Sequence, residues 1–429
     1  MRPTAFLVIV LLSIGACGRD STARVYDPRL PGTVTRRDSA GIAVIENTGP
    51  SWPDDASGRW TVDPTPVIDI GDGPDEHETF TRLTSAIRLG DGRTVTIDQS
   101  RREVKAFDRE GRFLAIWAHG GEGPGELPAM EGNPPRLFRL AGDSILVDAG
   151  KRFLLLLDSA GTFVDDMLRG QLFGPNRQPI WVMGRVIGGD VLIARRDSSW
   201  VLPQTADSPV DLVSLLRMSS TGEIRDTIGR FLTGRAVSMV AYDASPFIRR
   251  PMLHVARDRI YYGDMQRYEV HELDLTGRLT RIVRTRHVRA PIGRESLRPF
   301  QDRMLERLDS IVDRRRPPGG FPPGRRAQLM QRMRSQIEGW VVQDSAPAYL
   351  RFTTDDPGNL WVQEFRPPSI DRQNEWTVFD TAGRELGLVT MPGDLDILQI
   401  GDDFVLGQMR DSLDVDHLRL HRLRKPNSR

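Results

Sequence analysis

The clearest structural signal in the chain is the stretch TVTIDQSRREVKAFDREGRFLAIW, residues 94–117. It reads as three short strands separated by two turns. Val95 and Ile97 alternate with polar neighbours, and this period of two is typical of a β-sheet. At the second turn, Asp108 can accept hydrogen bonds from the following backbone N–H groups, and Gly111 can adopt the positive φ of a tight hairpin.

This arrangement recurs along the chain as two alternating units. One unit is a hairpin with the turn Asp-x-x-Gly or a variant, around Gly41, Gly111, Gly161, Gly222, Gly277 and Gly383. The other is a turn with Gly-Asp or a similar pair followed by a β-rich run, at residues 89–98, 141–148, 187–194, 257–264, 356–364 and 400–408. Together they supply about four short strands per repeat. The repeats therefore predict an all-β fold, a six-bladed β-propeller of four-stranded blades, because a solenoid would need capping ends and shorter repeats.

The last repeat is one strand short. After residues 400–408 the chain offers one more strand, at residues 417–423. Two N-terminal segments, residues 41–46 and 66–71, could supply the missing strand and cover an exposed sheet edge. We expect residues 66–71 to close the last blade, because IDIGDGPDE parallels the sequence IWAHGGEGPGE at the end of an earlier repeat.

Residues 119–128, HGGEGPGELP, contain four glycines and could present backbone N–H donors to an anion. A phosphate-binding loop, however, needs Lys and Ser or Thr after its last glycine, followed by a helix. Here Gly125 is followed by Glu-Leu-Pro. We therefore expect this stretch to connect one blade to the next.

The long interval between Gly277 and Gly383 contains the predicted helices, as an insertion at residues 293–340. Leu297, Phe300, Met304, Leu308 and Ile311 recur at helical spacing, residues 314–326 interrupt the pattern with proline and glycine, and residues 327–340 form a second amphipathic helix. This helical hairpin could cover one face of the propeller as a lid or a docking element, or it could pack on its side. The acidic residues Asp302, Glu306, Asp309 and Asp313 disfavour a membrane-surface helix.

Residues 1–17 have the pattern of a bacterial lipoprotein signal peptide. The apolar run at residues 5–12 is too short to span a bilayer, and it leads to Ser-Ile-Gly-Ala-Cys. We expect Cys17, the only cysteine, to be acylated; ordinary secretory cleavage near Ala16 is the alternative. The protein would then be exported and held by lipid at the outer membrane, facing the periplasm, or at the cell surface. Residues 18–59 would form a tether and N-terminal strand region, and residues 60–425 the propeller.

The charge of the chain is balanced. It has 59 Lys and Arg against 58 Asp and Glu, interleaved along the sequence, for a net charge of +1. This does not create the broad positive surface that phosphate-backbone binding requires. We therefore expect no nucleic-acid partner, membrane contact only through the N-terminal lipid, and a monomer. A single cysteine allows no disulfide within the chain, so stability depends on the core.

With these motifs, the chain resembles the NHL-like six-bladed propellers of uncharacterised exported bacterial lipoproteins. The family pattern V-x-D…R-x-x-x-F-D-x-x-G-x-F followed by G-x-x-G-x-G-x-L-x-x-P is similar to residues 95–113 and the glycine-rich stretch that follows, where Asp98 and Phe107 each stand one residue farther from Val95 and Arg102. Residues 358–387 resemble a late blade of the same group, and the likeness extends over residues 60–423. It implies a fold and a capacity to bind, and no particular reaction.

One set of candidate ligand-binding residues is defined by position. The β-rich runs end in an acidic residue followed closely by arginine, namely Asp98 with Arg102, Asp148 with Arg152, Asp264 with Arg267, and Glu364 with Arg366; Gln408 with Arg410 is a weaker version. If the blades superimpose, these residues form a ring of mixed charge near one rim of the central channel. Alternatively, each acidic residue pairs with its own arginine and fixes its loop.

The residues favour a non-catalytic binding protein whose partner is a protein, peptide or glycan of the cell envelope. The seven histidines are scattered, and we expect no cofactor and no metal; His417 and His421 share one strand face without a third ligand. Residues 75–78, DEHE, could chelate calcium or form a solvated loop. The alternative function is a metal-dependent hydrolase or lyase like the gluconolactonases, whose first motif the residues 122–124 resemble.

Overall fold

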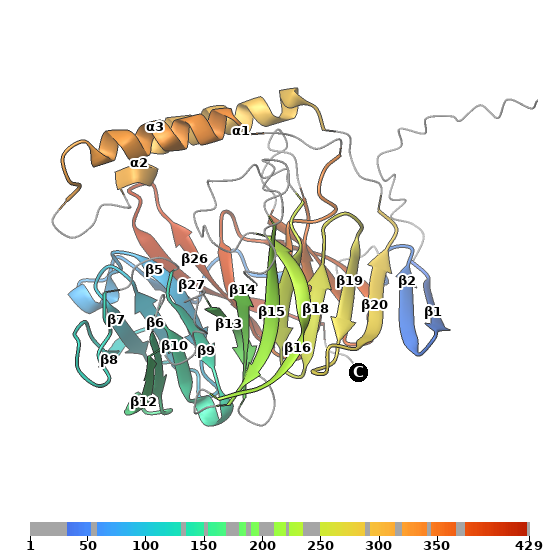
Figure 1. Cartoon of the computed structure of the whole chain (residues 1–429), viewed down its shortest axis with the longest axis horizontal. Helices are drawn as coiled ribbons and strands as arrows, with labels where there is room; N and C mark the ends of the chain where they lie inside the picture. Colours follow the sequence, from blue (N-terminus) through green and yellow to red (C-terminus); the bar gives the residue numbers. More distant parts are fainter. Residues whose placement is uncertain are drawn as a thin grey trace, which may run out of the picture.

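The strands form six blades, each of four antiparallel strands, arranged around a central axis (Figure 1). The computed structural model describes residues 32–52, 58–129, 134–149, 153–168, 180–185, 190–196, 210–219, 223–234, 249–287, 292–313, 320–340, 345–365 and 374–426. The predicted six-bladed propeller is confirmed. Residues 1–31, including Cys17 and the proposed signal peptide, lie outside the described residues.

The blades follow one another along the chain. The first three blades are β5 (Leu83–Arg88), β6 (Thr94–Asp98), β7 (Glu103–Phe107) and β8 (Phe113–Ala118); β9 (Arg136–Arg139), β10 (Ile145–Asp148), β11 (Phe153–Leu157) and β12 (Phe163–Leu168); and β13 (Ile180–Arg185), β14 (Val191–Arg196), β15 (Val210–Met218) and β16 (Ile224–Gly234). The last three are β17 (Met252–Ala256), β18 (Arg259–Gly263), β19 (Glu269–Leu273) and β20 (Leu279–Thr285); β21 (Arg351–Thr354), β22 (Leu360–Gln363), β23 (Asn374–Phe379) and β24 (Glu385–Met391); and β25 (Asp396–Ile400), β26 (Phe404–Arg410) and β27 (Asp416–Arg424) with the N-terminal β4 (Ile68–Ile70).

The first strand of each blade is the innermost one. First strands of neighbouring blades touch around the axis: β25 contacts β5, and contacts continue through β9, β13, β17 and β21. Because strands alternate in direction within a blade, every first strand begins, and every second strand ends, at the same face of the propeller. We call this the upper face.

The ring closes as predicted with a strand from residues 66–71. β4 runs antiparallel to β27, with Ile70 opposite Leu418 and Ile68 opposite Leu420. The short strand β3 (Thr61–Val62) pairs with the same edge of β27. The backbone N–H of Leu83 in the first blade donates to Asp416 Oδ2 of the last blade at 3.0 Å. These contacts join the two ends of the propeller.

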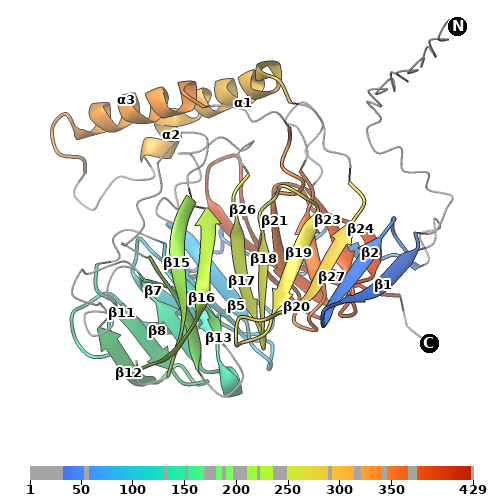
Figure 2. The same cartoon turned by 45° about the vertical axis from the view of Figure 1, so that its right-hand side comes forward.

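The other candidate segment, residues 41–46, has a different place. β2 (Ile42–Asn47) lies parallel to β20 and extends that blade at its outer edge, and β1 (Val34–Ser39) pairs with β2 (Figure 2). The Asn47 side chain donates to Gly383 O at 3.0 Å and accepts from Glu385 N at 2.9 Å. The N-terminal region therefore adds a hairpin to a complete blade and also ties it to the next one.

The predicted Asp-x-x-Gly turns lie between the third and fourth strands of the blades, except for the copy at Gly41, which joins β1 and β2. In the first, Asp108 Oδ1 accepts hydrogen bonds from Glu110 N at 3.0 Å and Arg112 N at 2.8 Å, and Gly111 has a φ of 88°. In the third blade Ser219 replaces the aspartate, and its hydroxyl oxygen accepts from Glu223 N at 3.0 Å. Gly222 of that turn lies outside the described residues.

The core lies between neighbouring blades. Val95, Val104, Ile145 and Leu155, for example, are fully buried in one cluster between the first and second blades. A second cluster packs Trp361 and other residues of the fifth blade against the last blade and the N-terminal segment. Each blade thus buries its faces on its neighbours, and a closed ring leaves no terminal blade with an apolar face exposed.

The described residues of the insertion form three helices that lie across the upper face (Figures 1 and 2). They are α1 (Arg294–Glu306), α2 (Leu308–Asp313) and α3 (Arg325–Glu338). The sequence predicts one helix through α1 and α2, but the chain bends at Arg307. This bend buries Leu308, Ile311 and Val312 of α2 against α3, and it places Ser310 Oγ 3.3 Å from Asp414 Oδ2 in the turn between β26 and β27. No helix among the described residues has the length and apolar character needed to cross a bilayer.

Candidate functional site

The predicted rim residues stand at the upper face, at the ends of second strands. Asp98 is fully buried, and its carboxylate accepts four backbone N–H groups, from Thr81 at 2.7 Å, Arg82 at 3.2 Å, Ser100 at 3.0 Å and Arg101 at 3.1 Å. This carboxylate holds the start of β5 and the loop after β6. Arg102 turns away from it and donates to Leu127 O at 3.4 Å.

Two other acidic residues of the set also contact the protein itself. Asp148 Oδ2 accepts from Val182 N of the next blade at 3.4 Å. Glu364 Oε1 accepts from the hydroxyls of Tyr268 at 2.5 Å and Thr377 at 2.6 Å, both buried. Burial, together with the negative charge of Glu364, holds the pKa of Tyr268 well above its usual range. These two carboxylates link neighbouring blades or neighbouring strands.

The remaining members of the set are less constrained. Asp264 is half-buried and accepts from Gln266 N at 2.8 Å, while Arg267 is exposed. Arg152 and Arg366 lie outside the described residues. Arg410 pairs with Asp416 at 2.6 Å. The described members of the set are therefore distributed around the upper face, blade by blade, and among them only Glu364 and the weaker member, Gln408 with Arg410, line one shared cleft.

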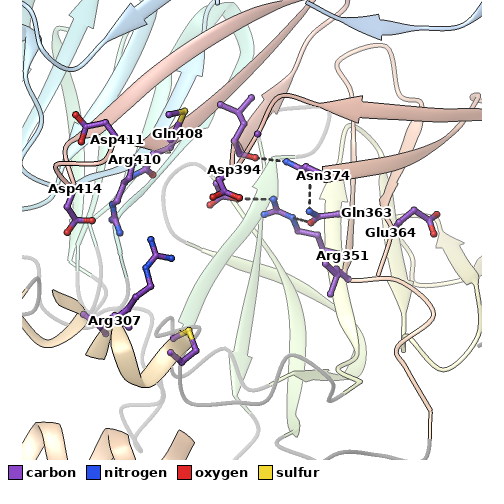
Figure 3. A pocket seen from close by; sticks show the side chains of 17 residues that line it. Arg307, Arg351, Gln363, Glu364, Asn374, Asp394, Gln408, Arg410, Asp411 and Asp414 are labelled. Atoms are coloured by element: carbon purple, nitrogen blue, oxygen red, sulfur yellow. Dashed lines mark hydrogen bonds and ion pairs between the residues drawn. The ribbon is translucent and has the colours of Figure 1, made fainter. Parts of the chain in front are cut away.

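That cleft has a volume of about 570 Å³ and lies between the helical insertion and the last two blades (Figure 3). Its roof is formed by Met304, Arg307 and Ile311 at the junction of α1 and α2. Its floor and walls come from the ends of β22 and β26 and from the starts of β21, β23 and β25, and they are lined by side chains of both charges and by amides. Such a mixture of polar groups over a partly apolar floor suits a polar ligand.

A hydrogen-bonded network fixes one wall of the cleft. Arg351 donates to Gln363 Oε1 at 2.8 Å and to Asp396 Oδ1 at 2.8 Å. Its guanidinium also stacks over the Trp376 ring, with Cζ 5.3 Å from the ring centroid. The Gln363 amide in turn donates to Asn374 Oδ1 at 2.9 Å. This wall is therefore preorganised, because each of these side chains is held by at least one partner.

The opposite wall holds a cation of a different kind. Arg307 is exposed at the bend between α1 and α2, and Figure 3 shows its guanidinium directed into the cleft near Arg410. Within the described residues its side chain makes no hydrogen bond or ion pair. The sequence pattern does not distinguish Arg307, because this residue lies in the middle of a continuous helical pattern of apolar residues.

The glycine-rich stretch forms a compact connector between β8 and β9. Leu127 N donates to His119 O at 2.8 Å, Gly121 N donates to Leu127 O at 3.0 Å, and Gly123 N donates to Glu126 Oε2 at 2.8 Å. The backbone N–H of Gly123, which could donate to a bound anion, therefore already donates to the chain's own carboxylate, Glu126. This geometry agrees with a connector between blades.

The other sequence candidates have structural contacts. Asp75 Oδ1 accepts from His77 N at 2.9 Å at the start of a short 3-10 helix, and Glu78 Oε1 accepts from Phe113 N at 3.2 Å. His417 and His421 are buried on β27, where their Nδ1 atoms lie 2.8 Å from Asp69 Oδ1 and 2.9 Å from Asp63 O. In the part of the chain that the structure describes, no group of three or more His, Cys, Asp and Glu side chains is placed to hold a metal ion.

A second cavity, of about 700 Å³, lies in the central channel and reaches the lower face. It is lined by residues from or next to the first strands of all six blades, including Ile87, Arg136, Met183, His254, Asp356 and Gln399. No direct signal for this cavity is present in the sequence, because these residues converge only when the ring is closed. The one hint was arginine at both ends of the short apolar run Arg136–Arg139.

Comparisons with known proteins support no assignment beyond the fold. No protein-family model matches the chain, and no curated protein matches it significantly. A candidate exported protein from Bacteroides fragilis has a similar structure, with a TM-score of 0.47 and 10% identity over 90% of this chain and 100% of that chain. A member of the DUF4221 family from Bacteroides vulgatus gives 0.46 and 10%, over 86% and 99% of the two chains. Virginiamycin B lyase from Staphylococcus aureus gives 0.39 and 8%, over 85% and 99%. Likeness at this level carries no information on ligand or reaction.

Proposed function

We propose that this protein is a lipid-anchored, non-catalytic binding propeller of the cell envelope, and that its partner occupies the cleft between the helical insertion and the last two blades. The observation that carries the proposal is the cleft itself: one wall is fixed by the Arg351 network, and the other presents the unpaired Arg307. Rigid walls with a few free polar groups favour binding, because little side-chain ordering remains to be done when the partner arrives.

The charges of the cleft favour a protein or peptide over a glycan as the partner. Asp394, Asp411 and Asp414 line the cleft together with Arg307. An uncharged glycan would leave Arg307 without a counter-charge. A peptide segment that carries an acidic residue would supply it, and its own basic or amide groups could meet the carboxylates.

Selection from a display library of short random peptides, with the full-length protein purified in detergent as bait, tests this proposal. Peptides that bind the wild type should lose at least about tenfold in affinity when Arg307→Glu reverses the charge in the cleft. Arg332→Glu is the matched control, because Arg332 is exposed on α3 and does not line the cleft. Selected peptides that bind both variants equally would contradict the proposed site.

The two remaining parts of the proposal have separate tests. Metabolic labelling with an alkyne fatty acid should mark the wild type and leave Cys17→Ser unlabelled, and a labelled Cys17→Ser protein would contradict lipidation at this residue. Metal analysis of the purified protein should find no divalent ion at unit stoichiometry. A tightly held ion that is lost on replacing channel carboxylates would support the gluconolactonase-like hydrolase instead.

A further inference from the structure

The central channel contains a cation whose own neighbours do not satisfy it. Arg136 begins the innermost strand β9, and its side chain is accessible to water from within the channel. Within the described residues its guanidinium makes no hydrogen bond or ion pair. The guanidinium stacks on the Phe138 ring, with Arg136 Cζ 5.2 Å from the ring centroid. Stacking of this kind fixes the plane of a guanidinium and leaves its N–H edges free to donate.

The surroundings of Arg136 are unfavourable for a positive charge. Burial lowers the pKa of the Arg136 guanidinium. The negative charge of Asp148, opposite Arg136 in the register of β9 and β10, raises this pKa but does not offset the effect of burial. Across the channel, burial first and the charge of Arg136 second lower the pKa of His254 to about 4. His254 is therefore neutral near pH 7, and its Nε2 lies 3.2 Å from the Thr354 hydroxyl.

The other charges in this cavity already have partners. Arg139 donates to Asp143 Oδ1 at 2.5 Å, and Arg257 donates to Pro357 O at 2.7 Å. Asp356 accepts from the Gln399 amide at 3.1 Å. Among the described lining residues, Arg136 is thus the positive charge that remains available to a ligand.

We propose that the central channel binds a small organic carboxylate, with its carboxylate on Arg136 and its apolar body against the channel wall. A guanidinium edge matches the two oxygens of a carboxylate and can donate to both. Phe138, Met183 and Ile87 supply an apolar wall beside it, and the cavity of about 700 Å³ has room for a ligand of ordinary size. This site is distinct from the cleft on the upper face, because the lining residues of the two cavities do not overlap.

Ligand-observed fluorine NMR with the full-length protein and 4-fluorobenzoate as the probe tests the inference. Arg136→Gln should weaken binding of the probe by at least about tenfold, because it removes a charge-assisted pair of hydrogen bonds. Two matched controls should bind the probe like the wild type: Arg139→Gln alters a paired arginine of the same cavity, and Arg307→Gln alters the other cleft. The neutral analogue 4-fluorobenzyl alcohol should bind at least about tenfold more weakly than the carboxylate.

A melting curve separates loss of binding from loss of fold. Since Arg136 has no bonded partner among the described residues, Arg136→Gln should melt no lower than the wild type. Added 4-fluorobenzoate should raise the melting temperature of the wild type and not that of Arg136→Gln. Absence of probe binding, equal binding to Arg136→Gln, or equally strong competition by inorganic phosphate would each overturn the proposed carboxylate site. Because Arg307 is not involved, these results are independent of the peptide-binding test.

Discussion

Replacing Asp98 by alanine should destabilise the propeller by about 3–6 kcal/mol. The buried carboxylate accepts four backbone N–H groups, and a hydrogen bond to a charged acceptor contributes about 1.5–3 kcal/mol. The four terms do not add in full, because some of these N–H groups are only partly buried and can turn to water, so about half of the sum is expected. For a chain of this length the loss corresponds to a decrease of about 3–7 °C in melting temperature.

The matched control is Asp264→Ala, at the equivalent position of the fourth blade. Asp264 is half-buried and accepts one backbone N–H, at 2.8 Å, so its loss should cost less than about 1 kcal/mol. Differential scanning fluorimetry and urea unfolding measure both variants. If Asp98→Ala unfolds like the wild type, the four hydrogen bonds do not hold this part of the fold, and a ligand-binding role for Asp98 is favoured.

Three further perturbations follow from burial and backbone geometry. Trp361→Ala should cost about 3–5 kcal/mol in urea unfolding, because Trp361 is fully buried between the last two blades; a loss below about 1 kcal/mol would contradict the packing described for this interface. His254 should titrate near pH 4 in NMR spectra of isotope-labelled histidine, below the value of about 6.5 expected in the unfolded chain. Between these two pH values the unfolded chain binds more protons than the folded one, so the free energy of unfolding should decrease as the pH falls from about 6.5 toward 4. A titration midpoint of His254 between pH 6 and 7 would contradict its burial in the channel. Gly142→Ala and Gly161→Ala both place a Cβ atom on a residue with positive φ, of 64° and 84°, at a cost of about 1–2 kcal/mol. Only at Gly161 would the new Cβ overlap a side chain, that of Trp117, so Gly161→Ala should have the lower melting temperature. Equal melting temperatures of the two variants would refute this contact.

Features set by local chemistry were predictable from the sequence. The hairpins at Gly111, Gly161, Gly277 and Gly383 all have positive φ at glycine, because an aspartate that accepts nearby N–H groups and a glycine that tolerates this φ specify the turn on their own. Closure by residues 66–71 was also predictable, since the last blade lacked one strand. Both candidate segments read equally well as strands, and only the structure assigned β2 to the edge of another blade.

Features set by the closed ring were not predictable. The bend at Arg307 interrupts a pattern of apolar residues that continues across it, and it is favoured by contacts of α2 with α3 and with the turn near Asp414. The two cavities join residues from distant parts of the chain, such as Arg136 and His254, which no spacing rule relates. The predicted rim residues show the same limit, because the sequence placed Asp98 at the correct strand end but could not reveal that its carboxylate is occupied by backbone N–H groups.

The most direct test of the closed ring is a disulfide between the first and last strands of the propeller. Asp69 and Arg419 are opposite each other in the register of β4 and β27, and their side chains form an ion pair at 2.8 Å. With Cys17 replaced by serine, the pair Asp69→Cys and Arg419→Cys should form a disulfide in the folded protein and raise its melting temperature, since the bond closes a loop of nearly the whole propeller. The pair Glu46→Cys and Arg419→Cys should remain reduced, because β2 lies against β20. A disulfide in the second pair, or none in the first, would contradict the closed ring.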